Sequence, residues 1–254
     1  MAEGAMERHY ASEIAQAATG QAPVSAAPPG SDLAHERLRH ALRRFPYGRN
    51  YEQLVRAELE GVGPAAAAAP LHMCGAGPLP LTGIWWHVLT GAEITLVEIE
   101  QEAAEVSQRV LEALAVSGVL DVDMVTVCVA DAASVDLGPG HVMAASLLPL
   151  DTVLRLTERR AAGPHRDGLL LIRSAAGLVA RLAYERVDVD QLTALGAQWV
   201  GTVAPASTMG APPTTRPDVG IGPGWPVPVT HAPAGVLNVT EVLQAMMAPG
   251  GKHR

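Results

Sequence analysis

The sequence predicts an α/β chain in which a doubly wound parallel sheet follows a small N-terminal helical region. Two observations lead to this prediction. From Leu71 onward, short apolar runs alternate with helical patterns, which is typical of parallel strands covered by helices on both faces. The first of these runs, residues 71–74, leads into a turn with two glycines, Gly75 and Gly77. Such a turn follows the first strand of many nucleotide-binding sheets.

The residues before Leu71 are expected to lie outside the sheet. Residues 1–30 end in a stretch rich in Ala and Pro, so we expect a flexible N-terminal segment there. Residues 31–64 predict a helical cap. Ser31 is suited to cap a first helix, and apolar residues at spacings of three and four from Tyr47 onward indicate a second.

The main domain is expected to cover residues 71–248. Its predicted strands cover residues 71–74, 93–99 and 124–131 and begin again at His141 and Gly168, and its predicted helices cover residues 103–116 and 151–160. A Pro- and Gly-rich insertion over residues 204–228 precedes a last strand-like segment over residues 231–243. The insertion is either a lid over the site or a disordered segment.

Composition and charge argue against several classes of function. The chain has 254 residues, of which 48% are hydrophobic and 17% are charged, as expected for a globular protein. Its net charge of −8 does not suit a nucleic-acid partner, and no apolar run reaches the roughly 18 residues of a membrane span. The two cysteines and nine histidines show no disulfide or metal-ligand spacing, so we expect a cytoplasmic protein without a metal.

Acidic residues follow two of the predicted strands at positions that suit a nucleoside. Glu98 lies about 20 residues beyond the glycine turn, where a carboxylate commonly holds a ribose diol. Asp131 ends the third strand, on the side that commonly contacts an adenine. The alternative explanation of the glycines is a tight turn that binds no ligand.

Prolines after the turn restrict the kind of nucleotide. The third glycine of a dinucleotide fingerprint is missing, and Pro78 and Pro80 stand close behind Gly77. Proline has no backbone N–H, so this loop lacks donors that would hold a pyrophosphate. A nucleoside without phosphates is favoured over NAD, and S-adenosylmethionine (SAM) has this chemistry.

Five segments resemble those of one enzyme family, the nicotianamine synthases. They are FPYGRNYEQLVRAE (residues 45–58), CGAGPLPLTGI (74–84), VEIEQEA (97–103), LLLIRSAAGLVARLAYERVD (169–188) and THAPAGVLNVTEVL (230–243). They occur in family order and span about residues 45–243. The resemblance implies a Rossmann-like sheet of the SAM-methyltransferase type with a small N-terminal helical cap.

The resemblance also implies chemistry on SAM other than methyl transfer. The family moves the 3-amino-3-carboxypropyl arm to an amine and releases methylthioadenosine. Bacterial metallophore synthases join this arm to a separate amino acid, whereas other relatives close it on itself to form azetidine-2-carboxylate. Both outcomes stay open, as do an ordinary methyltransferase and a SAM-binding regulator without turnover.

Two departures from the family put the acceptor site in doubt. The acidic segment of the longer N-terminal domain in plant and archaeal members has no convincing match, and Glu13 is the nearest upstream acid. The stretch MAASLLPL (residues 143–150) also replaces the family pattern.

Four residues are candidates for catalysis. Tyr47 and Tyr51 stand one helical turn apart, where a ring could steady a sulfonium or a hydroxyl could orient the attacking nitrogen. Glu58 is a candidate for arm binding or proton acceptance, and His231 for a base. The alternatives are packing of the cap for the tyrosines, a surface carboxylate for Glu58 and a structural histidine.

The SAM site is expected to draw on the glycine turn and on the ends of the strands. The candidate residues are Gly75, Ala76, Gly77, Pro78, Thr82, Glu98, Asp131, Ser146, Arg173 and Ser174. Arg173 stands in an otherwise apolar strand, so it needs a carboxylate partner. That partner is either the ligand's carboxylate or one of the protein's own.

Overall fold

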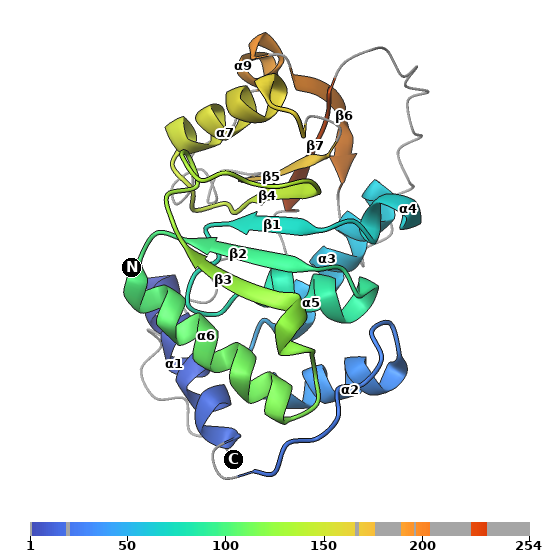
Figure 1. Ribbon diagram of the computed structural model, residues 1–254, viewed down its shortest axis with the longest axis vertical. Coiled ribbons are helices and arrows are strands. Elements are labelled where there is room, and N and C mark those ends of the chain that lie inside the picture. The colour runs from blue at the N-terminus through green and yellow to red at the C-terminus, as the bar shows by residue number, and fades with distance from the viewer. Residues whose placement is uncertain are drawn as a thin grey trace, which may run out of the picture.

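The centre of the molecule is a parallel sheet. The computed structural model describes residues 2–18, 21–165, 168–175, 189–195, 197–203 and 225–232. Within these residues, seven strands pair in the order β3-β2-β1-β4-β5-β7-β6, and every pairing is parallel. The chain builds outward from β1 to β3 and then returns to place β4 on the other side of β1 (Figure 1). This confirms the predicted doubly wound α/β fold.

The strands agree with the sequence prediction in the first half of the domain. They are β1 Leu71–Cys74, β2 Ile94–Glu98, β3 Val125–Val129, β4 His141–Ala144, β5 Leu170–Ala175, β6 Ala197–Val203 and β7 Trp225–Ala232. Strand β6 was not predicted. Strand β7 begins inside the expected insertion, and the rest of the insertion and of the segment 231–243 lies outside the described residues.

Helices cover both faces of this sheet. They are α1 Ala2–Ala17, α2 Asp32–Ala41, α3 Gly48–Val62, α4 Pro64–Ala67, α5 Leu81–Thr90, α6 Gln101–Val116, α7 Leu150–Ala162 and α9 Val189–Ala194, with a 3-10 turn, η1, at Val122–Met124. Ser31 caps α2 as expected, since its hydroxyl accepts a hydrogen bond from the N–H of Ala34 at 3.2 Å. None of the described helices is long and apolar enough to cross a membrane.

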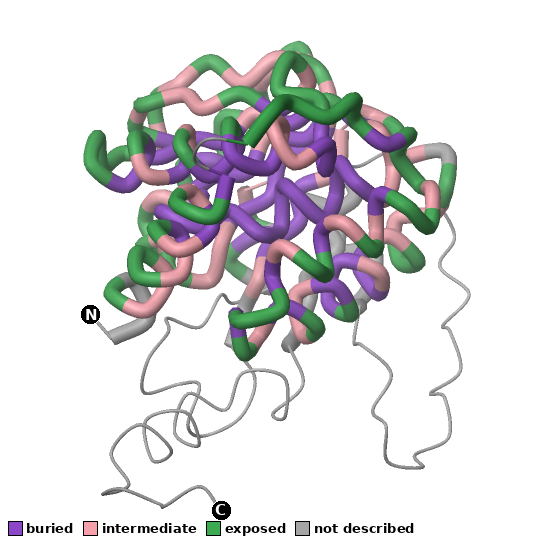
Figure 2. Tube along the Cα trace, turned by 90° about the horizontal axis from the view of Figure 1, so that it is seen from below, coloured by how far each residue is buried: buried purple, intermediate pink, exposed green. Residues whose placement is uncertain are grey.

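Two hydrophobic cores lie on opposite faces of the sheet, because successive side chains of a strand point to opposite sides. Along β1, Met73 belongs to one core and Cys74 to the other, and Leu96 and Val97 of β2 divide in the same way. Helices α1, α2, α3, α5 and α6 cover the first core, and α7 and α9 cover the second. Figure 2 shows the buried positions gathered along the middle of the trace.

The expectation of a flexible N-terminal segment over residues 1–30 is wrong for its first half. Helix α1 lies alongside α6 (Figure 1), with Ala11 and Ile14 buried against the first core. The linker that follows is extended but held, because the N–H of Val24 donates to the carbonyl of Val116 at 2.9 Å. Burial of these small side chains explains why the segment folds.

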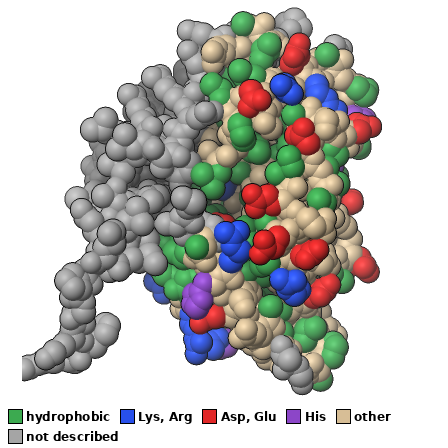
Figure 3. All heavy atoms as spheres, turned by 90° about the vertical axis from the view of Figure 1, so that its left-hand side faces the viewer, with side chains coloured by type: hydrophobic (Ala, Val, Ile, Leu, Met, Phe, Trp, Pro, Cys, Tyr) green, Lys and Arg blue, Asp and Glu red, His purple; other side chains and the backbone are tan. Residues whose placement is uncertain are grey.

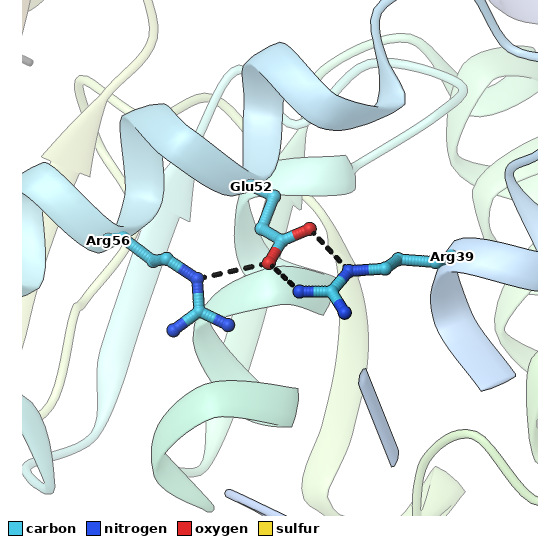
Figure 4. Close-up of polar contacts among 3 residues, drawn as sticks. All are labelled: Arg39, Glu52 and Arg56. Carbon is cyan, nitrogen blue, oxygen red and sulfur yellow. Dashed lines mark hydrogen bonds and ion pairs between the residues drawn. The ribbon is translucent and has the colours of Figure 1, made fainter. Parts of the chain in front are cut away.

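Helices α2 and α3 of the cap are joined by one carboxylate (Figure 4). Arg39 on α2 donates two hydrogen bonds to Glu52 on α3, at 2.9 and 2.6 Å, and Arg56 donates a third at 3.0 Å. The hydrogen bond from Arg39, with a further one from Arg56, holds the pKa of Glu52 below its ordinary value even though burial opposes this. This carboxylate therefore holds α2 to α3, because separating the helices would leave Glu52 buried without Arg39.

We predict that acid destabilises the fold through His141 at the start of β4. The N–H of Leu169 donates to Nδ1 at 2.9 Å and Nε2 lies 2.7 Å from the carbonyl of Ala66, an arrangement that needs the neutral ring. Burial lowers the pKa of His141 from about 6.5. Its contribution to stability is therefore complete above about pH 6.5 and is lost as the pH falls from there through the folded-state pKa.

Urea unfolding measured from about pH 7.5 to about pH 5 should show a falling midpoint. The fall should be smaller in His141→Gln. Part of it should remain, because burial also lowers the pKa of His72. His9→Gln serves as the control because the His9 side chain is 66% exposed. An equal fall in the wild type and in His141→Gln would contradict the assignment.

Candidate functional site

The turn after β1 has a backbone that only glycine adopts readily. Gly75 and Gly77 have φ values of 75° and 68°, in the left-handed region. A Cβ atom at Gly75 would also lie 3.1 Å from Cγ of Leu148, in the segment that follows β4. The sequence prediction of a tight glycine turn is confirmed, and the segment after β4 covers one side of it.

All three N–H groups of this turn are used inside the protein. Gly75 and Ala76 donate to the carbonyl of Val97 at 2.9 and 3.2 Å, and Gly77 donates to Oε2 of Glu98 at 2.8 Å. The next residue, Pro78, has no N–H to offer. The turn therefore does not present these amide donors to a phosphate, and its exposed polarity is that of acceptors.

Glu98 connects the end of β2 to the glycine turn. Besides accepting the hydrogen bond from Gly77, its carboxylate accepts one from the N–H of Glu100 at 3.0 Å, and the residue is 8% exposed. A carboxylate has about four acceptor positions, so two backbone bonds leave capacity for the hydroxyls of a ribose.

Arg173 of β5 finds its carboxylate partner within the protein. Its Nε and one terminal nitrogen donate to the two oxygens of Glu58 on α3, at 2.8 and 2.9 Å, and its other terminal nitrogen donates to the hydroxyl of Thr82 on α5 at 2.7 Å. Glu58 is fully buried, and 10% of the Arg173 side chain is exposed. In this Glu58–Arg173 pair, the carboxylate partner that the sequence required for Arg173 is one of the protein's own.

The electrostatic surroundings of Arg173 favour the charged form of its guanidinium. Burial lowers the pKa of Arg173, but the charge and hydrogen bonds of Glu58, with a smaller contribution from Tyr51, outweigh burial and raise that pKa above its ordinary value. Arg173 donates to both oxygens of Glu58, which ties α3 to β5.

Aromatic rings gather at the start of α3, the helix that carries Glu58. The ring of Phe45 meets Tyr47, Tyr51 and Tyr10 at centroid distances of 5.8, 6.3 and 5.1 Å. These four residues form the aromatic cluster. It joins three parts of the chain: α1, which carries Tyr10, the turn between α2 and α3, which carries Phe45, and the start of α3.

The other predicted residues are placed at the same edge of the sheet or near it. Asp131 is exposed and accepts a hydrogen bond from the N–H of Ala133 at 2.9 Å, so its printed contact is local. Ser146 lies half-buried in the turn after β4. Ser174 and His231 are register partners on β5 and β7, one residue beyond Arg173, and their side chains lie outside the described part of the structure.

The structure adds residues that sequence reasoning missed. Exposed apolar side chains stand at the ends of three strands: Ile99 is 66% exposed, Leu147 62% and Val129 48%. Figure 3, which looks toward the ends of β1 and β2, shows hydrophobic side chains interspersed with acidic and basic ones. The sequence signal that could have identified Ile99 as a site residue is its position directly after Glu98. Apolar side chains exposed at this edge suit the flat face of a base.

Among the described residues, no group of three or more His, Cys, Asp or Glu could hold a metal ion. Cys74 lies beneath the glycine turn, where burial raises the pKa of its thiol to about 12. It packs as a small hydrophobe, in agreement with its place in an apolar strand.

This fold places the chain among the doubly wound α/β proteins. The model of the family described as nicotianamine synthase protein matches residues 31–207, which is more than half of the chain. The chain therefore belongs to the nicotianamine synthase family, as the five segments indicated.

Solved structures of MtNAS resemble this chain. A glutamate-to-glutamine mutant of MtNAS in complex with S-adenosylmethionine has a TM-score of 0.55 and 28% identity, over 74% of this chain and 63% of that one. MtNAS in complex with MTA and tNA has a TM-score of 0.54 and 29% identity, over 74% and 61%. The match thus spans less than two thirds of the MtNAS chain. No curated protein matches this chain.

We predict that Glu58→Gln destabilises the protein by about 3 kcal/mol, because it leaves the Arg173 charge buried without its counter-charge. Urea unfolding measures this change. Glu60→Gln, at an exposed position of the same helix, is the matched control and should stay within about 0.5 kcal/mol of the wild type. A double variant, Glu58→Leu with Arg173→Met, should recover most of the loss. Equal stability of Glu58→Gln and Glu60→Gln would refute the role of the pair.

Proposed function

We propose that this protein transfers the 3-amino-3-carboxypropyl arm of SAM to an amine nucleophile and releases methylthioadenosine. Membership of the nicotianamine synthase family supports this reaction. The observation in this chain that carries it is the placement of α3, with Tyr51 and Glu58, against β5 and against α5, the helix that follows the glycine turn. Relatives of known structure bind SAM in one case, and MTA and tNA in another.

The edge of the sheet suits SAM as the substrate. Glu98 is placed to accept hydrogen bonds from the ribose, and Ile99 and Val129 offer apolar contact to the adenine. The glycine turn keeps its N–H groups for the protein, which disfavours phosphates and agrees with a nucleoside that carries none. Gly75, Ala76, Gly77 and Pro78 would form the floor beneath the arm.

The chemistry depends on which carbon of the sulfonium is presented to the nucleophile. The amine nitrogen attacks the arm carbon bonded to sulfur, a C–N bond forms, and the C–S bond breaks with its electron pair passing to sulfur. The amine must be neutral when it attacks, and it loses a proton to a base or to water as the product forms. The protein's part is to fix the arm in line with that nitrogen.

Tyr51 is the tyrosine that we assign to this role, because it precedes Glu58 by two helical turns on α3 and belongs to the aromatic cluster. Tyr47 flanks it one helical turn away. We assign Glu58, Thr82 and Arg173 to holding α3 in place, which differs from proton acceptance by Glu58. His231 on β7 is the register partner of Ser174 on the neighbouring strand β5, and we retain it as the candidate base. Asp131 and Ser146 are proposed to line the adenine side.

Product analysis tests the reaction. Pure protein should convert SAM to methylthioadenosine in the presence of an amino-acid panel, as chromatography with mass spectrometry would measure. Turnover only with an added amine would establish condensation. Methylthioadenosine with azetidine-2-carboxylate from SAM alone would establish the second outcome for this family, intramolecular cyclisation. S-adenosylhomocysteine as the nucleoside product, or SAM binding without turnover, would refute arm transfer.

We predict that Glu98→Gln weakens the binding of SAM, S-adenosylhomocysteine and methylthioadenosine alike, by about tenfold, because all three share the ribose. Isothermal titration calorimetry measures the three dissociation constants. Glu102→Gln, in the first turn of α6 and exposed, is the control. Unchanged affinity for all three ligands would remove Glu98 from the ribose site.

A further inference from the structure

The connection from β3 to β4, residues 130–140, contains no helix, and the structure describes all of it. Asp131 stands at its start, where β3 ends. Beyond Asp131 the connection packs on the second hydrophobic core, in which Ala132 is buried and which Val135 and Leu137 contact. A segment of this kind has main-chain carbonyls that need hydrogen-bond partners from elsewhere in the protein.

Arg159, in the last turn of α7, binds the start of this connection. Its two terminal nitrogens donate to the carbonyls of Ala133 and Val135, both at 2.9 Å. The N–H groups of the same two residues donate to Asp131. That of Ala133 reaches Oδ1 at 2.9 Å, and that of Val135 reaches the main-chain carbonyl at 2.9 Å. Ala133 and Val135 therefore each link Arg159 to Asp131 through their main chain.

The helix that carries Arg159 is itself fixed on the sheet. Leu156, three positions earlier, is buried in the second core. The neighbouring Arg160 is buried and donates to the carbonyl of Gly138 at 3.1 Å and to that of Gly140, so it binds the far end of the same connection. Arg159 thus acts from a rigid support, which a residue that positions another one needs.

This arrangement leaves one oxygen of the Asp131 carboxylate for a ligand. Oδ1 accepts the hydrogen bond from Ala133, whereas no described residue donates to Oδ2, and Asp131 is exposed. A carboxylate accepts hydrogen bonds and does not donate them, so Oδ2 suits an N–H group such as the 6-amino group of adenine. An acceptor that is already held in place loses less conformational freedom when a ligand binds.

We propose that Arg159 is a positioning residue for recognition of the adenine base. By holding Ala133 and Val135, it presents Oδ2 of Asp131 to the 6-amino group, so that Asp131 makes the contact and Arg159 acts through it. The proposal rests on the proposed function for the presence of an adenine nucleoside, and it concerns binding rather than turnover.

Two nucleosides that differ only at the 6-position of the base test this proposal. They are methylthioadenosine and the 5′-methylthio purine riboside in which hydrogen replaces the 6-amino group. We expect wild-type protein to bind methylthioadenosine about tenfold more tightly, as one hydrogen bond to a charged group would give. Arg159→Met keeps an apolar stem and removes the donors. Isothermal titration calorimetry should show this preference reduced to about twofold, with the affinity for the analogue unchanged.

Three further variants sharpen the measurement. Arg155→Met is the matched control on α7, since the Arg155 side chain is 65% exposed and lies 3.9 Å from Asp151, and it should keep the wild-type preference. Arg159→Lys keeps a charge that can reach one of the two carbonyls and should recover part of the preference. It also carries the test if thermal melts show that Arg159→Met is unfolded. Asp131→Ala should lose the preference, and adding Arg159→Met to it should change the preference no further.

A full preference for methylthioadenosine in Arg159→Met would overturn the proposal, because Arg159 would then serve only the stability of the connection. An equal loss of affinity for both nucleosides would overturn it as well, and so would a wild-type protein without the preference. Failure of the proposed reaction is seen separately. In that case wild-type protein would convert SAM to S-adenosylhomocysteine or to no product, while the preference for the 6-amino nucleoside remained.

Discussion

The Glu58–Arg173 pair is the interaction on which the arrangement of the site depends. It joins residues 115 positions apart in sequence and connects the cap, through α3, to strand β5, while Thr82 ties the same guanidinium to α5. Neither charge is tolerable alone in so buried a place, so the cap cannot leave the sheet without a large loss of free energy. Because α3 is fixed in this way, the aromatic cluster at its start is fixed too, and α1 rests against that cluster.

The sequence predicted those features of the fold that a local pattern of residues determines. Apolar runs marked β1 to β5, and two glycines marked a turn whose left-handed backbone demanded them. It did not reveal the partner of Arg173, because a contact over 115 positions leaves no periodic signal. Helix α1 was not predicted because Ala11 and Ile14 are its only described residues that are buried, which leaves a weak hydrophobic pattern. Strand β7 escaped because it contains Pro226 and Pro228, residues that are depleted in strands.

Aromatic residues make up only 4% of the chain, and four of them gather in or beside the cap. The only Phe and three of the four Tyr residues form the aromatic cluster, whereas the first core is filled with Ala, Leu and Val around Trp85 and Trp86. Aliphatic side chains suffice to pack helices on a sheet. Rings contribute large contact areas and preferred edge-on geometries, so a few of them can fix the junction of three elements. That junction is where the proposed site needs rigidity.

The charge of the site also bears on how a reaction there would end. Glu98 stands at the end of β2, and the Glu58–Arg173 pair is internally neutralised, so the Glu98 carboxylate gives the glycine turn a negative charge. SAM, with two positive centres and one carboxylate, is matched to this charge. Arg173 is committed to Glu58, so the arm's carboxylate has to find its donors elsewhere. Once the arm has left, methylthioadenosine is neutral and no longer carries a positive centre that this negative charge attracts. The same electrostatics that hold the substrate would thus weaken the grip on the nucleoside product and favour its release.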